Sequence, residues 1–143
     1  EELATRLDKL FDGDEPTTGE AAREQVRALV EVWSAARPIE LQAEADCWMY
    51  FDKSPERTSH LITVVSEAIS NALRHGRDGS IAVRLDCLGD GSVELVVTNP
   101  GILRQVRVGA DAGLGMATMR ELCESVSLDQ EGGRVELRAL FAA

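Results

Sequence analysis

The chain has 143 residues, the length of one domain, and its hydrophobic content of 44% is sufficient for a buried core. Its formal net charge of −10 argues against a general binder of nucleic acid or anionic membranes, because these ligands are also negative, but it leaves room for a local basic pocket for phosphate. The cysteines, Cys47, Cys87 and Cys123, lack the spacing of a zinc site or disulfide framework. No apolar run approaches the ~20 residues that span a bilayer. We therefore expect a cytoplasmic domain, and because the chain starts at Glu1 without Met, a piece of a longer protein.

The first predicted elements are helices followed by one strand. Residues 1–11 are typical of the end of a helix, and an acidic, turn-rich segment follows. Residues 20–37 predict an amphipathic helix that ends at Pro38. Residues 39–51 alternate in part between apolar and polar side chains, which predicts a strand. The apolar stripe of the helix consists of Val26, Leu29, Val30 and Trp33.

A long central helix is predicted next, with Ser54 as its N-cap and Pro55 as its first residue. It runs over residues 56–75 and stops at Gly76. The later predicted elements are strands at 80–89 and 91–99 joined by a hairpin, a glycine-containing loop at 100–114, a helix at 115–126 and a strand pair within 127–141. Hairpins joined by helices indicate an α+β fold in two layers, with a mixed, mostly antiparallel sheet and helices on one face.

The central helix carries a polar stripe beside its apolar face. Glu67, Asn71 and His75 recur every four residues on the shoulder of that face. Asn is a poor helix former, and a half-buried amide costs free energy unless both of its ends are bonded. Oxygen coordination of a hard cation uses such a stripe, because an Asn oxygen and phosphate oxygens can complete the shell of Mg²⁺. The alternative is that all three are ordinary boundary residues.

A second feature is the glycine pair at the predicted start of the next helix. Gly113 and Gly115 flank Leu114, where a close backbone approach and free N–H groups favour an anion. The pattern does not match a P-loop. The nearby positive side chains, which suit a polyphosphate, are Arg104, Arg107 and Arg120. The alternative is a flexible turn with solvated surface arginines.

The polar stripe in "SEAISNALRHG", the strand ending in "VVTNPG" and the later "GLGMATMREL" follow each other in an order that resembles the GHKL ATPase superfamily. The resemblance is greatest to the ATP-binding (HATPase) domain of bacterial sensor histidine kinases. It implies a Bergerat-type two-layer α/β sandwich over residues 38–143. Residues 1–37 would then be an N-terminal helical segment, the tail of a dimerisation region or a short arm in its place.

The resemblance also implies roles for single residues. Asn71 would ligate Mg²⁺, and Glu67 would be the catalytic carboxylate beside the metal or its water. Residues 102–112 would form the ATP lid. The implied ATP-binding residues are Asn71, Arg74, His75, Asn99, Gly101, Gly113, Leu114, Gly115 and Met116.

Two positions depart from the family pattern. Asn99 stands where the family usually has an Asp that accepts a hydrogen bond from the adenine amino group. An Asn oxygen can accept the same bond, but its NH₂ end then needs another acceptor. Arg134 follows Gly133 where many relatives have a Thr behind the adenine. These departures keep open a non-catalytic scaffold of the same fold, and a serine kinase that binds sigma-factor regulators is a further alternative.

The function implied by the resemblance is presentation of Mg-ATP for phosphoryl transfer to a His on a dimerisation and phosphoacceptor domain, with a response regulator as the next partner. The resemblance leaves a homodimer open, implies no direct binding of nucleic acid, and would allow membrane attachment only through another part of a full-length protein. The histidines are His60 and His75, and neither stands in a phosphoacceptor motif. We therefore expect a histidine protein kinase activity that this chain cannot direct at itself.

Overall fold

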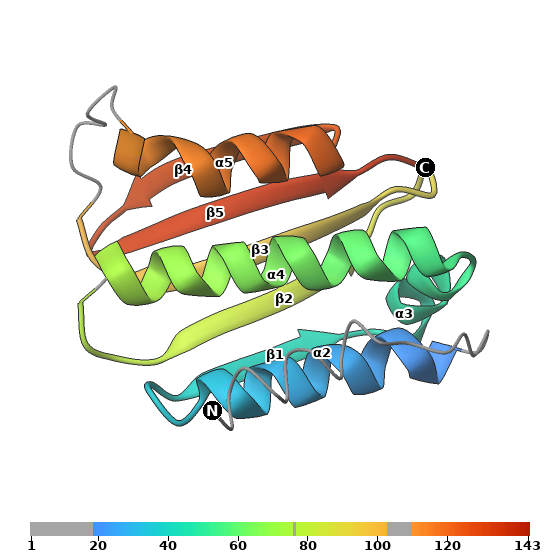
Figure 1. The fold of residues 1–143 in the computed structure, drawn as a ribbon, viewed down its shortest axis with the longest axis horizontal. Coiled ribbons are helices and arrows are strands. Elements are labelled where there is room, and N and C mark those ends of the chain that lie inside the picture. The colour runs from blue at the N-terminus through green and yellow to red at the C-terminus, as the bar shows by residue number, and fades with distance from the viewer. Residues whose placement is uncertain (1–18, 76, 103–109) are drawn as a thin grey trace.

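The computed structural model describes residues 19–75, 77–102 and 110–143 (Figure 1). The helices and strands are, in chain order, α2 (Gly19–Trp33), β1 (Ile39–Ala43), α3 (Ala45–Asp52), α4 (Pro55–His75), β2 (Ile81–Cys87), β3 (Val93–Pro100), α5 (Ala110–Leu122), β4 (Ser125–Glu131) and β5 (Arg134–Phe141). The helix predicted over residues 1–11 lies outside the described residues. None of the described helices is long and apolar enough to cross a bilayer.

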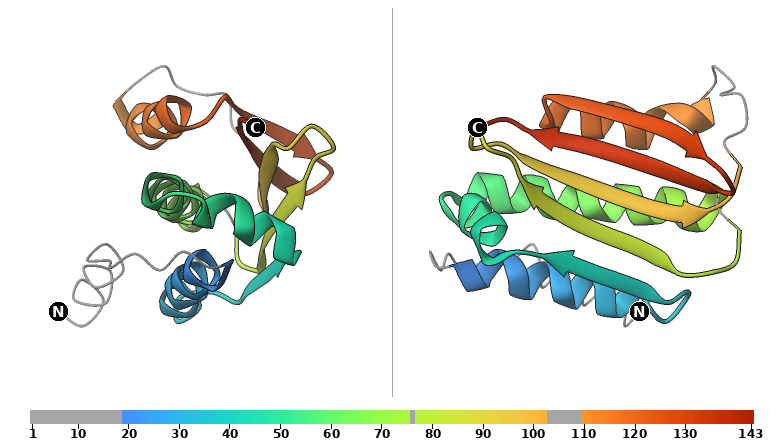
Figure 2. Two further views of the ribbon diagram at one scale, coloured as in Figure 1. Left: turned by 90° about the vertical axis from the view of Figure 1, so that its right-hand side faces the viewer. Right: turned by 180° about the vertical axis from the view of Figure 1, so that it is seen from behind.

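The five strands form one sheet in the order β1-β2-β3-β5-β4. β1 is parallel to β2, and the other neighbours are antiparallel. Helices α2, α4 and α5 lie side by side over one face, as the end-on view in Figure 2 shows. This confirms the predicted α+β fold, with a mixed, mostly antiparallel sheet and helices on one face.

The core lies between the sheet and the helices. Along β3, Val93, Leu95 and Val97 are buried on the helix-facing side, as strand alternation requires. The predicted apolar arc of α4 faces them, and Leu61 and Ile69 within it are fully buried. α2 belongs to the same core, since its stripe residues Val26, Leu29 and Val30 are buried among these side chains.

Several local predictions from the sequence are confirmed. Ser54 caps α4 by accepting a hydrogen bond from the Arg57 N–H at 3.1 Å, and Pro55 is the first helical residue. β2 and β3 form the predicted hairpin, and β4 and β5 form the predicted final pair. These features depend on short-range chemistry that a sequence displays directly.

The strand predicted over residues 39–51 is wrong beyond Ala43, because residues 45–52 form helix α3. Cys47 and Phe51 are both fully buried, and their spacing of four places them on one helical face. Five consecutive apolar residues hid this period. Asp46 in the first turn also favours the helix, because a carboxylate stabilises a helix N-terminus.

The predicted start of the next helix is also wrong, since α5 begins at Ala110 rather than at residue 115 and ends at Leu122 rather than at residue 126. Ala110 and Ala112 are strong helix formers, and Asp111 suits the first turn. These residues extend the helix in front of the glycine pair. Gly113 and Gly115 therefore lie inside α5 and not at its start.

Candidate functional site

The polar stripe of α4 lies at the edge of its buried face. Glu67 and Asn71 are half-buried, whereas Arg74 is exposed. The Arg74 guanidinium donates a hydrogen bond from Nη2 to Asn71 Oδ1 at 3.0 Å. Within the described residues, the Glu67 carboxylate makes no hydrogen bond or ion pair. The Asn71 oxygen is therefore bonded to an exposed side chain at the edge of the buried face of α4.

The last residues of β3 place a second amide close to the helix layer. Asn99 has the same strand parity as Val97, so its side chain faces the helices, and it is only 6% exposed. Its Nδ2 donates a hydrogen bond to the Pro100 carbonyl at 3.0 Å. The NH₂ end of Asn99 therefore has the acceptor that a buried amide needs. This bond also fixes which end of the amide is the acceptor.

Backbone contacts join the C-terminal end of α4 to the end of β3. The Arg77 N–H donates to the Pro100 carbonyl at 2.8 Å. Gly79 adopts a φ of 138°, and a Cβ there would lie 2.8 Å from Pro100 Cγ. The Arg37 guanidinium donates from Nε to the Gly79 carbonyl at 2.9 Å and from Nη1 to the Ala72 carbonyl at 3.3 Å. Arg37 thus ties this junction to the helix.

The turn between β4 and β5 holds the other side of the β3 end. The Gly101 N–H donates to the Gly133 carbonyl at 2.9 Å. Gln130 Nε2 donates to the Gly101 carbonyl at 3.0 Å and to the Gly132 carbonyl at 2.7 Å. Figure 1 shows that the end of α4, the end of β3, this turn and the start of α5 all lie at one end of the molecule. The hydrogen bonds of Arg37 and Gln130 could not be predicted from sequence periodicity, because their partners are backbone groups of distant segments.

Arg134 does not lie on the face that carries Asn99. In the register of β3 and β5, Asn99 pairs with Val135 and Pro100 pairs with Arg134. Strand alternation therefore puts Val135 beside Asn99 on the helix-facing side, and exposed Arg134 on the opposite side. The Arg at this position does not crowd the side chains around Asn99.

The remaining predicted site residues that the structure describes belong to α4 and α5. His75 is the last residue of α4, and its side chain lies outside the described part. Gly113, Leu114, Gly115 and Met116 lie in α5, with Met116 packed in part against the core. Arg120 is exposed in the last turn of α5, whereas Arg104 and Arg107 lie outside the described residues. Most of the predicted lid, residues 103–109, lies outside them too.

The residues at this end fit a magnesium nucleotide. The Asn71 amide oxygen is a neutral, hard donor of the kind that Mg²⁺ accepts, and Glu67 lies one turn away on the same shoulder. Arg74 and Arg77 supply positive charge at the C-terminal end of α4, and both are exposed. The described residues contain no group of three or more His, Cys, Asp or Glu side chains placed to hold a metal. A magnesium ion at Asn71 would thus share its oxygen shell with phosphates and water.

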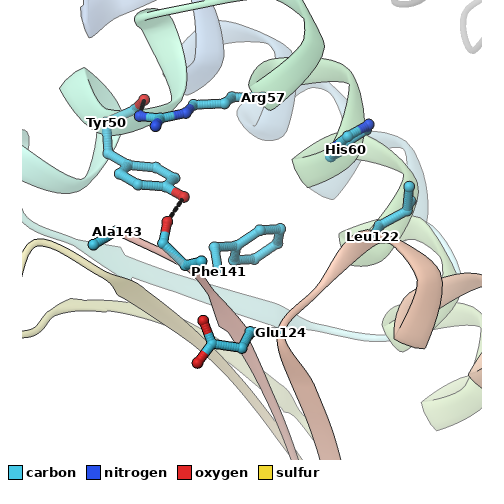
Figure 3. Close-up of a pocket in the computed structure, with 8 residues that line it drawn as sticks. Tyr50, Arg57, His60, Leu122, Glu124, Phe141 and Ala143 are labelled. Carbon is cyan, nitrogen blue, oxygen red and sulfur yellow. Dashed lines mark hydrogen bonds between the residues drawn. The ribbon is translucent and has the colours of Figure 1, made fainter.

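A separate cavity of about 430 Å³ lies at the other end of α4 (Figure 3). The Tyr50 hydroxyl points across it and donates to the Ala142 carbonyl, and the Arg57 guanidinium lies 4.2 Å from the centre of the Tyr50 ring. His60 lines this cavity. At roughly 1.5 Å per residue, His60 lies about 16 Å along the helix axis from Asn71. The cavity and the polar stripe are therefore different sites.

Comparisons with solved structures agree with this fold. The chain is similar to the histidine kinase domain of the Erythrobacter litoralis EL346 blue-light activated histidine kinase, at 17% identity and a TM-score of 0.61 over 98% of this chain and 71% of that one. It is similar to the catalytic domain of histidine kinase ThkA, at 15% identity and a TM-score of 0.62 over 90% of this chain and 93% of that one. Full-length ShkA in complex with AMPPNP matches at 18% identity and a TM-score of 0.55 over 99% of this chain and 35% of that one. No curated protein matches the chain.

The sequence comparison assigns the family. Residues 56–141 match the model of the histidine kinase-, DNA gyrase B- and HSP90-like ATPases. This match begins with α4 and runs to the last residue of β5, so it contains the polar stripe, the end of β3 and α5. Because it covers more than half of the chain, the protein belongs to the family of histidine kinase-, DNA gyrase B- and HSP90-like ATPases.

Proposed function

We propose that this chain is the catalytic domain of a sensor histidine kinase, which binds Mg-ATP and presents it to a His on a partner domain. The observation that carries the proposal is the Asn71 oxygen at the half-buried edge of α4, which accepts a hydrogen bond from the exposed Arg74 guanidinium at 3.0 Å. The Asn71 oxygen could ligate a metal ion while the neighbouring Arg74 guanidinium binds a phosphate that contacts the same metal. The histidine kinase domains among the similar structures support the reaction class.

Ligand binding would replace the hydrogen bond between Arg74 and Asn71 with a contact from each residue to the ligand. The Asn71 oxygen that accepts from Arg74 is the atom that would ligate Mg²⁺, so the Arg74 guanidinium is released toward the phosphates. Guanidinium groups bind phosphate through charge-assisted, often bidentate hydrogen bonds. Glu67 would orient the metal's water one turn further along the helix. The metal, when bound, neutralises the charge that develops on the phosphates.

Asn99 would select the base. Because its Nδ2 is engaged by the Pro100 carbonyl, the amide presents Oδ1 as the acceptor for a ligand. An acceptor at this position favours the amino group of adenine over the carbonyl of a 6-oxopurine. We therefore expect Mg-ADP to bind more tightly than Mg-IDP, by about tenfold, the value of one well-placed hydrogen bond.

The glycine pair would hold the phosphates after a local change in α5. Helical N–H groups beyond the first turn are bonded to carbonyls of the preceding turn, so they do not face a ligand. Gly113 and Gly115 lie in this helix, and each Gly weakens it by about 1 kcal/mol relative to Ala. We propose that the first turns of α5 unwind, which turns the amides of Gly113 and Gly115 toward the phosphates.

Phosphoryl transfer needs positioning and electrostatics more than covalent chemistry from the protein. The acceptor His in this proposal belongs to a dimerisation domain, and a response regulator receives the group next. The domain would act as part of a cytoplasmic homodimer. His60 of this chain lies about 16 Å from Asn71, too far to take the γ-phosphate directly. Radiolabel from labelled ATP should stay off both histidines of this chain, and its appearance on His60 or His75 would contradict the proposal.

Isothermal calorimetry with Mg-ADP tests the binding site. The wild type is expected to bind at micromolar level, and Asn71→Ala to lose binding while its melting temperature stays within a few degrees. Ser70→Ala is the matched control, because Ser70 neighbours Asn71 on α4 and is also half-buried. It should bind like the wild type. Silence of the wild type at millimolar nucleotide would overturn the proposal and leave the scaffold alternative.

A further inference from the structure

Two cysteines from different elements meet on the helix-facing side of the sheet. Cys47 lies in the first turn of α3, and Cys87 is the last residue of β2. They are 40 positions apart in the chain, yet their sulfur atoms lie 2.9 Å apart. Nothing in the proposed nucleotide site uses them, and their separation in sequence hid the pair.

The fold holds both thiols in place. Cys87 has the same strand parity as Leu85, so its side chain points to the helix layer, where α3 lies. The Cys47 sulfur also lies 3.6 Å from the Leu85 carbonyl oxygen. A disulfide bond is about 2.05 Å long, so bond formation requires the sulfur atoms to approach by less than about 1 Å.

The two thiols differ in access to solvent. Cys87 is exposed, whereas Cys47 is 0% exposed. Burial, and then the neighbouring Cys87 thiol, raise the pKa of Cys47 to about 12. Cys47 is therefore protonated at neutral pH and shielded from soluble oxidants. The difference in exposure makes Cys87 the thiol that reacts first, and Cys47 completes the bond as it gives up its proton.

We propose that Cys47 and Cys87 are a dithiol site that hydrogen peroxide converts into an intramolecular disulfide. In the first step the O–O bond breaks, one oxygen bonds to the Cys87 sulfur as a sulfenic acid, and water leaves. In the second step the Cys47 sulfur attacks the Cys87 sulfur, and the hydroxyl leaves with the Cys47 proton as a second water. Two thiols lose two electrons in total, and the peroxide is reduced to water.

The disulfide would close a covalent ring that includes the central helix α4. The closed ring contains all of α4, because this helix lies between Cys47 and Cys87 in the chain. A cross-link over 40 positions restricts the unfolded chain, which is expected to raise the melting temperature by about 10 °C. This effect does not depend on nucleotide binding.

Thiol counting after peroxide treatment tests the site. The protein is treated with hydrogen peroxide, denatured and alkylated, and its free thiols are counted by mass spectrometry. The three free thiols are expected to fall to one, and dithiothreitol should restore three. A non-reducing tryptic digest should join the peptides 28–53 and 85–104, which contain Cys47 and Cys87. The melting temperature should rise with the cross-link.

Variants in which one cysteine is replaced by serine provide the controls. Cys123 is buried in another part of the fold, so Cys123→Ser should still form the cross-linked peptide. Cys87→Ser should lose neither remaining thiol and show no rise in melting temperature. The proposal is overturned if three thiols remain in the wild type, if Cys87 becomes a sulfinic acid beside a free Cys47 thiol, or if the bond joins two chains.

Discussion

Arg74 and Asn71 form a hydrogen-bonded pair at the surface of α4. The guanidinium is exposed, so its contact with the Asn71 oxygen contributes little to stability. The Arg74 guanidinium matters for ligand binding because it lies beside the oxygen that would ligate a metal. A residue of this kind changes ligand affinity without changing the fold.

Arg74→Ala is expected to weaken Mg-ADP binding about tenfold, because a charge-assisted hydrogen bond to phosphate contributes about 1.5–3 kcal/mol. The melting temperature without nucleotide should change by less than about 2 °C, since exposed substitutions stay within about 0.5 kcal/mol. Arg27→Ala, on the exposed side of α2, is the charge-matched control. Equal affinities of Arg74→Ala and Arg27→Ala would show that Arg74 does not meet the ligand.

Asn99→Asp separates stability from base recognition. An ionised carboxylate at position 99 would face the Pro100 carbonyl with no proton to donate, so the free energy of unfolding should fall by about 1–3 kcal/mol. This carboxylate would accept a stronger, charge-assisted bond from the adenine amino group, so Mg-ADP should bind several-fold more tightly. Thermal unfolding and calorimetry measure the two effects. Weaker ADP binding with unchanged stability would contradict the assigned amide orientation.

α3 and α2 are coupled through one buried carboxylate. Asp52 Oδ1 accepts a hydrogen bond from the Ala22 N–H at the start of α2, at 2.9 Å. Its Oδ2 is buried without a hydrogen-bond partner among the described residues. Burial raises the pKa of Asp52, and this outweighs the lowering by the N–H groups of Ala22 and Ala21. The folded protein therefore binds the Asp52 proton more tightly than the unfolded chain does.

This shift has a defined sign in the pH dependence of stability. The folded pKa of Asp52 lies above the ordinary value of 3.8. Protonated Asp52 therefore raises the free energy of unfolding at pH values below 3.8, and this contribution disappears as pH rises through the folded pKa. The Asp52→Asn variant should lack this pH-dependent contribution to the free energy of unfolding, because Asn does not titrate. The melting temperature of the variant relative to wild type should therefore rise as the pH increases from 3.8 through the folded pKa of Asp52. A constant difference across that range would contradict it.

α5 offers a test of the proposed unwinding. Gly113→Ala is expected to stabilise the helix by about 1 kcal/mol, because Ala is the better helix former. If the first turns must open to bind phosphate, the same change should weaken Mg-ADP binding about fivefold. Ala117→Gly, in the same helix and exposed, reverses the propensity effect outside the glycine pair. Tighter nucleotide binding by Gly113→Ala would contradict the unwinding.

Elements with one clear local signal were predictable from sequence. The cap at Ser54, the apolar arc of α4 and the β2–β3 hairpin each depend on neighbours within a few residues. α3 was not predictable, because its five consecutive apolar residues fit a strand as well as a helix, and packing on the sheet decides between them. The early start of α5 was hidden by its two glycines, which are usual in loops.

The whole molecule brings the site together from segments far apart in the chain. The stripe of α4 and the end of β3 were predictable as site residues because both carry polar groups beside apolar runs. The contacts that hold them, from Arg37 to the Ala72 and Gly79 carbonyls and from Gln130 to the Gly101 carbonyl, were not. Their partners are backbone groups, which no residue type reveals. The pairing of Cys47 with Cys87 was hidden for a related reason, since only the fold brings α3 to the end of β2.

Gly79→Ala tests this junction as a unit. The backbone at Gly79 has a φ of 138°, and the added Cβ would lie 2.8 Å from Pro100 Cγ. Strain and overpacking together should lower the free energy of unfolding by about 2–4 kcal/mol, and the shifted Pro100 should weaken Mg-ADP binding. Gly89→Ala is the control, because nothing lies within 4 Å of a Cβ at that position. Equal melting temperatures for the two variants would contradict the close packing at Pro100.

A crystal structure of the domain with Mg-AMPPNP would show whether Asn71 ligates the metal. We expect Asn71 Oδ1 to ligate the metal at about 2.1 Å, the Arg74 guanidinium to have moved from this oxygen to a phosphate, and the adenine amino group to contact Asn99. A nucleotide bound in the cavity beside His60, or an Asn71 oxygen that keeps its bond to Arg74 while the metal lies elsewhere, would contradict it.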